Sequence, residues 1–183
     1  MRTGTKSVLF GVHAFWYHPI TVWRAWRELY GRRPDFWETV AIVVHDLGYV
    51  GCEHMDDAHG ERHPIFGAEL IRRLYRATHR ATPFYEAEAR RLHRLVRYHS
   101  RYLAARERRN PSPLCWPDKL SLRFDPPAFY LFRARLSGEL AQYRMAARQK
   151  ICLSASDTMW LEWLTTESEF DALQHRTVEP RKS

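Results

Sequence analysis

The residues best suited to chemistry are histidines and aspartates that stand where apolar stretches end. His45 and Asp46 are adjacent, follow the apolar run 41–44, and are followed two residues later by Gly48. A carboxylate carried into a core costs several kcal/mol unless a cation or hydrogen-bond donors surround it. Neutral imidazole and carboxylate are both good ligands for divalent metals, so the pair indicates a buried metal ligand set. A helix-end histidine beside a solvated aspartate is the structural alternative.

Other residues share this placement beside a predicted helix end and an apolar run. With His45 and Asp46, the candidate ligands are His18, His63, His99 and Asp118. Four histidines and two carboxylates suit two metal ions, with Asp46 bridging them. A hydroxide held between two cations is a nucleophile at neutral pH, and both cations can bind the phosphoryl oxygens that it attacks. Two alternatives stay open: His63 and His99 are ordinary half-buried histidines beside a single metal, or His13 replaces His18 as the first ligand.

Helical periodicity predicts the elements that position these residues. We expect helices that begin near 18–19, 34–35, 63–64 and 82–83, because proline is favoured in the first helical turn and each pair contains one. Two long helices are expected over 128–149 and 156–175, with loops over 47–62 and 104–117. No segment shows an alternating strand pattern. The chain is therefore predicted to be an all-α protein with a single domain over 1–183.

Composition bounds the class of protein and its partners. The 183 residues, 45% of them hydrophobic, are enough for one domain with a substantial core. No run approaches the length of a membrane span, and the N-terminal stretch is a poor signal peptide. Cys52, Cys115 and Cys152 are odd in number and widely spaced, so we expect no disulfide framework and a cytoplasmic location. The net charge of +8, mostly from arginine, favours anionic partners such as nucleotides or nucleic acid.

The order of the candidate ligands resembles that of the HD-domain metal-dependent phosphohydrolase superfamily, in its subgroup with a six-ligand dinuclear site. The stretch from His63 to Ile71 is similar to the His-Pro-x-x-Gly motif of HD-GYP phosphodiesterases. The segment 97–100 (Arg-Tyr-His-Ser) resembles the Arg-Tyr-His-Thr stretch of HD hydrolases that cleave diadenosine tetraphosphate. Asp118-Lys119 resembles the Ala-Asp-Lys that closes the same group, with Pro117 in place of alanine. The resemblance covers 13–125 and implies an HD-domain helical bundle with an additional C-terminal helical extension over 126–183.

The resemblance also implies roles for individual residues. His18, His45, Asp46 and Asp118 would hold one metal, and His63 and His99 would hold a second with the bridging Asp46. Histidine-rich ligation favours iron or manganese, with cobalt or magnesium left open. The resemblance implies catalytic roles for Asp46, His63 and Lys119, where Lys119 orients Asp118 or meets a phosphate.

Three departures from the family pattern stand out. Many members carry Lys or Arg three residues after the Asp of the His-Asp pair, and here that residue is Tyr49. Substrate binding is therefore assigned to Tyr49, Arg62, Arg97, Arg101 and Lys119. The Gly-Tyr-Pro signature is missing after His99, which argues against cyclic di-GMP as substrate. Pro117 before Asp118 is expected to affect the angle of the last ligand.

These observations predict a metal-dependent phosphohydrolase that cleaves a phosphoester or phosphoanhydride bond of a nucleotide-like substrate. A mixed-valent di-iron oxygenase acting on a polyol or phosphonate, similar to myo-inositol oxygenase, is the second hypothesis. A non-catalytic nucleic-acid or nucleotide-binding module is the third, with the arginines at 90–109 as a candidate channel wall. The acidic stretch 53–59 is interpreted as a solvated loop rather than another metal site. No membrane partner is expected, and a homo-oligomer stays open.

Overall fold

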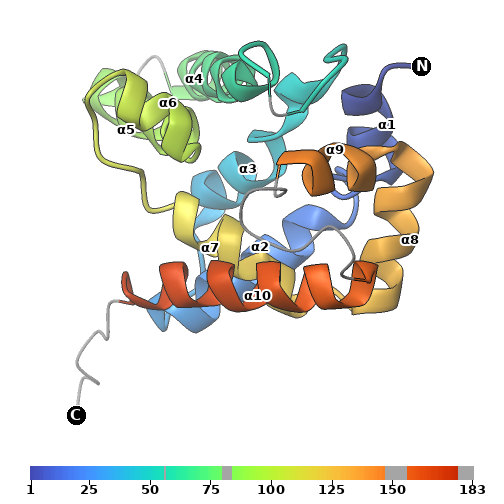
Figure 1. Cartoon of the computed structure of the whole chain (residues 1–183). Coiled ribbons are helices and arrows are strands. Elements are labelled where there is room, and N and C mark those ends of the chain that lie inside the picture. The colour runs from blue at the N-terminus through green and yellow to red at the C-terminus, as the bar shows by residue number, and fades with distance from the viewer. Residues whose placement is uncertain (56, 80–83, 147–155, 177–183) are drawn as a thin grey trace.

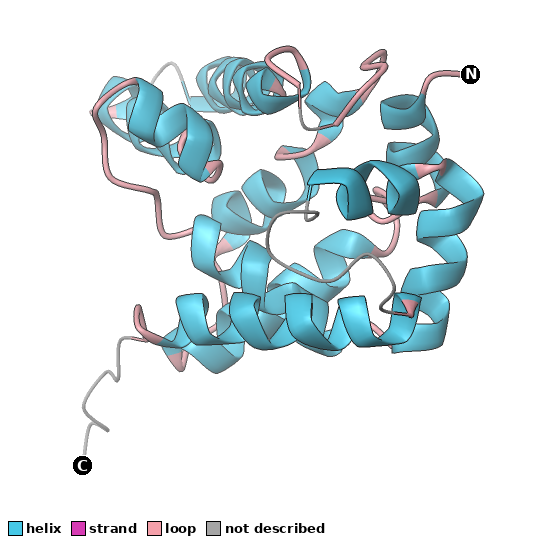
Figure 2. Cartoon of the chain, viewed as in Figure 1, coloured by secondary structure: helices cyan, strands magenta, loops and turns pink. Residues whose placement is uncertain are grey.

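The computed structural model describes residues 1–55, 57–79, 84–146 and 156–176. These residues form helices and loops, with no strand among them (Figure 2). The all-α class predicted from periodicity is therefore confirmed. Within the described ranges, no helix is both long enough and apolar enough to cross a membrane.

The helices that frame the candidate ligands follow one another through the first two thirds of the chain. They are α2 (His18–Tyr30), α3 (Phe36–Val44), α4 (Pro64–His79), α5 (Tyr85–Arg97), α6 (Arg101–Arg106) and α7 (Cys115–Leu120). Three 3-10 turns lie among them: η1 (Leu47–Tyr49), η2 (Gly60–Arg62) and η3 (Ser121–Phe124). The remaining helices are α1 (Thr3–Phe10), α8 (Pro127–Ser137), α9 (Glu139–Ala146) and α10 (Asp157–Leu173).

Local start signals account for several of these boundaries. Proline stands in the first turn of α2, and α3 begins with a capping box in which Asp35 accepts from the Glu38 backbone N–H at 2.7 Å. The helix start predicted at 82–83 falls outside the described residues, and α5 is described from Tyr85 onward. The helix predicted over 156–175 corresponds to α10.

Two predicted boundaries are wrong. The helix expected over 128–149 ends at Ser137, because Gly138 adopts the left-handed conformation with φ 90°, and α9 then begins in a new direction. The loop expected over 104–117 is shorter than predicted, since α6 continues to Arg106 and α7 begins at Cys115. Pro117 is accommodated in the first turn of α7, where no backbone N–H is needed.

The two largest of four hydrophobic clusters among the described residues hold most of the bundle together. The larger joins α2, α3, α4 and α5 through buried residues such as Trp26, Ile42, Ile71 and Leu92. The second joins α8, α9 and α10 around Trp160, Tyr130 and Leu131. In Figure 1, α4, α5 and α6 lie on one side of the molecule and α1, α8 and α9 on the other, while α10 packs along α7. Five of the six candidate ligands lie at or beside helix ends, and Asp118 lies within α7.

Candidate metal centre

The structure brings all six predicted ligands together from five places in the chain. His18 begins α2, His45 and Asp46 follow the last residue of α3, and His63 immediately precedes α4. His99 lies between α5 and α6, and Asp118 lies within α7. Helix ends suit this role, because the backbone changes direction there and lets a side chain point inward between elements.

Two glycines permit the close approach of α4 to the end of α3. A Cβ atom on Gly48 would overlap the carbonyl oxygen of His63, and one on Gly67 would lie 2.5 Å from the carbonyl oxygen of Val44. Any larger residue at either position would push the His63 segment away from Asp46. These glycines therefore set the separation of the two halves of the site.

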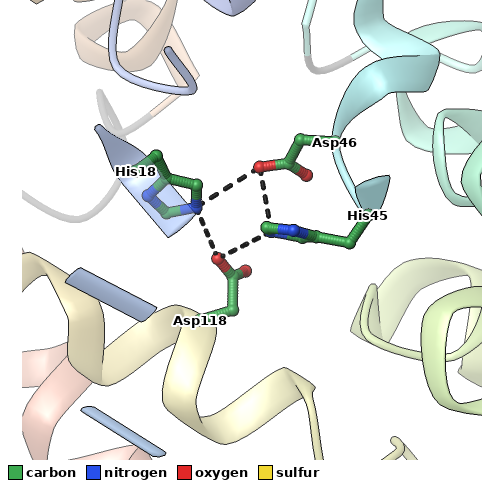
Figure 3. A group of neighbouring side chains, drawn as sticks. All are labelled: His18, His45, Asp46 and Asp118. Atoms are coloured by element: carbon green, nitrogen blue, oxygen red, sulfur yellow. Dashed lines mark hydrogen bonds and ion pairs between the residues drawn. The ribbon is translucent and has the colours of Figure 1, made fainter. Parts of the chain in front are cut away.

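The first group of ligands forms a closed ring of four side chains (Figure 3). His18 Nε2 lies 3.3 Å from Asp46 Oδ2 and 3.0 Å from Asp118 Oδ1. His45 Nε2 lies 3.0 Å and 3.4 Å from the same two oxygens. Asp118 therefore reaches the site although Pro117 precedes it. Two nitrogens and two oxygens facing one another at this spacing can hold a divalent metal ion.

The second group shares Asp46 with the first but uses its other oxygen. Asp46 Oδ1 lies 3.4 Å from His63 Nε2 and 3.4 Å from His99 Nε2. The two imidazole nitrogens lie 3.0 Å from each other. All members of both groups are buried except Asp118, which is partly exposed, and among the described residues these are the clusters of histidine and carboxylate that can hold a metal ion.

Backbone hydrogen bonds orient three of the four imidazole rings. The Nδ1–H of His45 donates to the Ile42 carbonyl at 2.7 Å, that of His63 to the Gly60 carbonyl at 2.8 Å, and that of His99 to the Val96 carbonyl at 2.7 Å. Each acceptor lies three residues earlier, at the end of the preceding helix or turn. A carbonyl accepts but cannot donate, so each Nδ1 carries the proton and each neutral ring presents the lone pair of Nε2 to the site.

This arrangement has too many acceptors for a site without a cation. In the neutral rings of His63 and His99, two nitrogen lone pairs face each other at 3.0 Å, which is repulsive. Asp46 Oδ2 is buried without a well-aligned hydrogen bond from any described residue. A bound cation removes both problems, because it accepts electron pairs from nitrogen and oxygen alike. The donor set therefore fits two divalent metal ions that share Asp46.

The pKa directions follow from burial and from the two carboxylates. Burial lowers the pKa of His63 to about 4, so this ring is neutral near pH 7. Burial also acts against the charged form of His45, but the nearby Asp46 charge and the Asp118 oxygen outweigh it and raise the pKa of His45 well above its ordinary value. Despite the cost of burial, the charge on His45 holds the pKa of Asp46 well below its usual range. Without metal, a proton on His45 takes part of the place of a cation.

A cavity of about 340 Å³ opens directly onto the two groups, a volume in the range of small-molecule sites. Of the ligands, Asp46, His63, His99 and Asp118 line it. The other lining residues are His13, Tyr49, Glu61, Ser100, Arg101, Tyr102 and Lys119. The cavity therefore places both cationic and hydroxyl side chains beside the candidate metal groups.

The substrate-binding residues predicted from sequence divide into two sets. Lys119, Arg101 and Tyr49 line the cavity, while Arg62 and Arg97 do not. Arg97 instead makes two hydrogen bonds to Glu107, at 2.5 Å and 3.0 Å. Neither Arg62 nor Arg97 borders this cavity, so their assignment to substrate binding stays a prediction without support from it.

Tyr49 has a role that the sequence did not indicate. Its ring stacks on His63 with centroids 3.8 Å apart and an angle of 16° between the planes. The side chain is buried, so it holds the imidazole in place from one face. Sequence reasoning expected a substrate contact at this position. In the structure, Tyr49 instead supports the candidate ligand His63.

The acidic stretch 53–59 is built as a turn. Asp57 Oδ1 accepts the backbone N–H groups of His59 and Gly60, at 2.9 Å and 2.7 Å, which leads into η2 and His63. Met55 is buried, and its backbone N–H donates to Gln142 of α9 at 3.0 Å. Asp56 lies outside the described residues. The described part of this stretch thus positions the His63 segment and adds no metal group of its own.

Three lining residues were not assigned a role from sequence, namely Glu61, Ser100 and Tyr102, and a fourth, His13, was considered only as an alternative ligand. Ser100 caps α6 and its hydroxyl lies 3.3 Å from Glu61, a pairing across 39 residues that no local pattern indicates. His13 was the rival for the first ligand. The structure places it beside the ligand groups but outside both of them, with its Nδ1 3.0 Å from Glu139.

Comparison with known proteins adds no identity: no family model matches the chain, and no curated protein or solved structure matches it.

Proposed function

We propose that this protein is a metal-dependent phosphohydrolase of the HD-domain type, acting on a nucleotide-like phosphoester or phosphoanhydride. One observation carries the proposal: a buried aspartate that turns one oxygen toward each of two histidine groups, at the floor of a cavity containing Lys119 and Arg101. Two divalent ions in such a site supply an activated water nucleophile and positive charge beside the phosphoryl group. Iron or manganese suits the histidine-rich ligand set best.

The side chains of the cavity have distinct parts in this proposal. His18, His45 and Asp118 complete the first metal group with Asp46, and His63 and His99 complete the second. Lys119 follows Asp118 in α7 and lines the same cavity, and its ammonium group is assigned to bind a phosphoryl oxygen. Arg101 is assigned a second phosphate contact, although its guanidinium also pairs with Asp171 at 2.6 Å at the protein surface.

The proposal is tested by metal content and hydrolysis together. Wild-type protein purified gently and supplied with Mn²⁺ is expected to hold about two metal ions per chain and to release phosphate or nucleoside from a nucleotide panel. Asp46→Ala is expected to lose both properties, and His63→Ala to lose the second metal with most of the activity. Asp157→Ala serves as the control, because Asp157 pairs with Arg135 and Arg144 away from the cavity. Metal-loaded protein that hydrolyses no phosphoester would contradict the proposal.

A di-iron oxygenase is the second candidate, and Tyr49 is the observation that favours it. At the position where a phosphate-binding cation is expected, an aromatic ring stacks on His63 instead. Oxygen consumption with a phosphonate or polyol, dependent on iron and absent with manganese, would favour the oxygenase. Phosphate release with manganese under anaerobic conditions would favour the hydrolase.

A further inference from the structure

His13 borders the cavity without belonging to either metal group. It lies in the turn between α1 and α2, and its ring centroid is 5.5 Å from that of His18 and 4.9 Å from that of Tyr49. Its Nδ1 is engaged by protein groups, whereas its Nε2 makes no hydrogen bond to any described residue. The Nδ1 edge of the ring is therefore bonded to the protein, and the Nε2 edge is available to a molecule in the cavity.

The Nδ1 edge of His13 is held by a carboxylate that is fully buried. Glu139 Oε1 lies 3.0 Å from His13 Nδ1 and also accepts from Ser7 at 2.6 Å and from Tyr143 at 3.0 Å. Its Oε2 accepts the Val12 backbone N–H at 2.9 Å and the hydroxyl of Ser137 at 2.5 Å. Because the Ser7 hydroxyl gives its proton to Glu139, the proton between His13 and Glu139 resides on Nδ1. The orientation of the ring is thereby fixed.

The position of Glu139 in the chain gives the C-terminal helices a role at the cavity. Glu139 is the first residue of α9 and lies 126 residues after His13. The left-handed Gly138 makes the turn from α8 into α9 that directs Glu139 inward. The helices beyond 125 therefore reach back to hold a cavity-lining side chain.

A second histidine–glutamate pair, His93 and Glu69, lies outside the cavity and serves as a comparison for His13 and Glu139. His93 Nε2 lies 3.2 Å from Glu69 Oε1, between neighbouring helices α5 and α4. Glu69 is partly exposed and pairs with Arg72 as well, and His93 does not line the cavity. His13 differs in both respects, because its carboxylate is buried and its free nitrogen borders the metal groups.

We propose that His13, with a proton on each ring nitrogen, donates a hydrogen bond from Nε2 to an oxygen of the phosphorylated substrate in the cavity, and that Glu139 is the residue that positions it. The inference rests on the proposed function for the class of substrate. It adds to that function a substrate contact outside the ligand set and outside Lys119 and Arg101. It also assigns the C-terminal helices to the binding site.

Two substitutions separate the two edges of the ring. His13→Asn keeps a polar group where Nδ1 meets Glu139 but removes the far nitrogen, whereas His13→Gln places an amide nitrogen near the position of Nε2. We would titrate inorganic phosphate into the Mn²⁺-loaded proteins by calorimetry and measure their metal content. kcat and KM would be determined on the best substrate of the panel. His93→Asn and His93→Gln are the matched controls.

His13→Asn is expected to retain the metal ions and to bind phosphate about 10-fold or more weakly, the loss of one charge-assisted hydrogen bond. KM is expected to rise in step, while His13→Gln recovers most of the phosphate affinity and the His93 variants behave as wild type. Wild-type phosphate affinity in His13→Asn would overturn the inference, and so would loss of metal from that variant. Phosphate binding that depends on His13, in a protein that hydrolyses no phosphoester, would overturn the proposed function and leave this inference standing.

Discussion

Two buried carboxylates, Asp46 and Glu139, sit a short distance apart in environments of opposite kind. Asp46 is 6% exposed and is surrounded by imidazole nitrogens, three of them in rings whose Nδ1–H already donates to a backbone carbonyl, so a ring can donate to Asp46 only when it takes up a second proton. Glu139 is 0% exposed and accepts five hydrogen bonds. The donors are the hydroxyl groups of two serines and one tyrosine, the ring of one histidine, and one backbone N–H.

The difference separates a functional carboxylate from a positioning one. A buried carboxylate that the protein itself satisfies with donors has no need of a ligand, and it stiffens whatever it holds. A buried carboxylate that faces acceptors is stable only with a cation. In this molecule the satisfied carboxylate holds His13 at the edge of the cavity, and the unsatisfied one lies at its floor.

The largest effect is expected from removing the satisfied carboxylate. Glu139→Ala leaves the donors from α1, α8 and α9 unpaired in the interior, so it should lower the free energy of unfolding by about 3–5 kcal/mol, with or without metal. Denaturant unfolding measures this. Glu69→Ala, in the partly exposed pair with His93, should cost no more than about 1 kcal/mol. Equal losses of stability for the two variants would contradict the proposed difference between the buried and the partly exposed carboxylate.

Removing the charge of Asp46 should change the stability of the protein mainly by preventing metal from binding. Saturating Mn²⁺ is expected to stabilise the wild type by about 3 kcal/mol at a concentration 100-fold above the dissociation constant, and Asp46→Asn should show no such gain. The metal-free variant should lose little stability relative to metal-free wild type, because asparagine keeps the shape of the side chain and gives up only the attraction between the Asp46 charge and the protonated His45. Thermal unfolding with and without chelator tests both statements. A large loss of stability in metal-free Asp46→Asn would contradict them.

The stability of the metal-free protein should depend on pH through the protonation of His13. Burial lowers its pKa, but the charges of Asp46 and Glu139 outweigh burial and raise it from 6.5 to about 9. The folded state then binds this proton more tightly than the unfolded state, so the stabilisation is complete below pH 6.5 and is lost as the pH rises through about 9. The difference in Tm between wild type and His13→Gln should shrink by about 5 °C over that window. A difference that is constant with pH would disprove the assignment.

The smallest effect should come from removing one of the five donors. Tyr143→Phe deletes the hydroxyl that donates to Glu139 Oε1 at 3.0 Å and leaves the other four in place. We expect a loss of about 1 kcal/mol and an unchanged metal content. Tyr102→Phe, in a tyrosine of α6 that is 42% exposed, is the control for stability. A loss as large as that of Glu139→Ala would show that the five hydrogen bonds act as one unit.

Much of the fold and of the ligand set could be predicted from sequence. Apolar residues at helical spacing, with proline in the first turn, predicted α2 and α4, and the end of an apolar run identified His45 and Asp46. The break at Gly138 was missed, because one glycine inside a long amphipathic pattern is compatible with a continuous helix. The helix α7 was missed because three nearby prolines are typical of a loop.

The sequence by itself determined which side chains are available at helix ends, since periodicity and helix signals are local properties of the chain. Only the tertiary structure decided which of them meet. Arg97 and Arg101 are four residues apart with the same chemistry, yet one pairs with Glu107 away from the cavity and the other lines it. The role of Glu139 could not be predicted locally, because three of its five partners lie in α1 and in the turn after it, more than 120 residues earlier. Contacts across such distances depend on the packing of whole helices, which spacing along the chain does not encode.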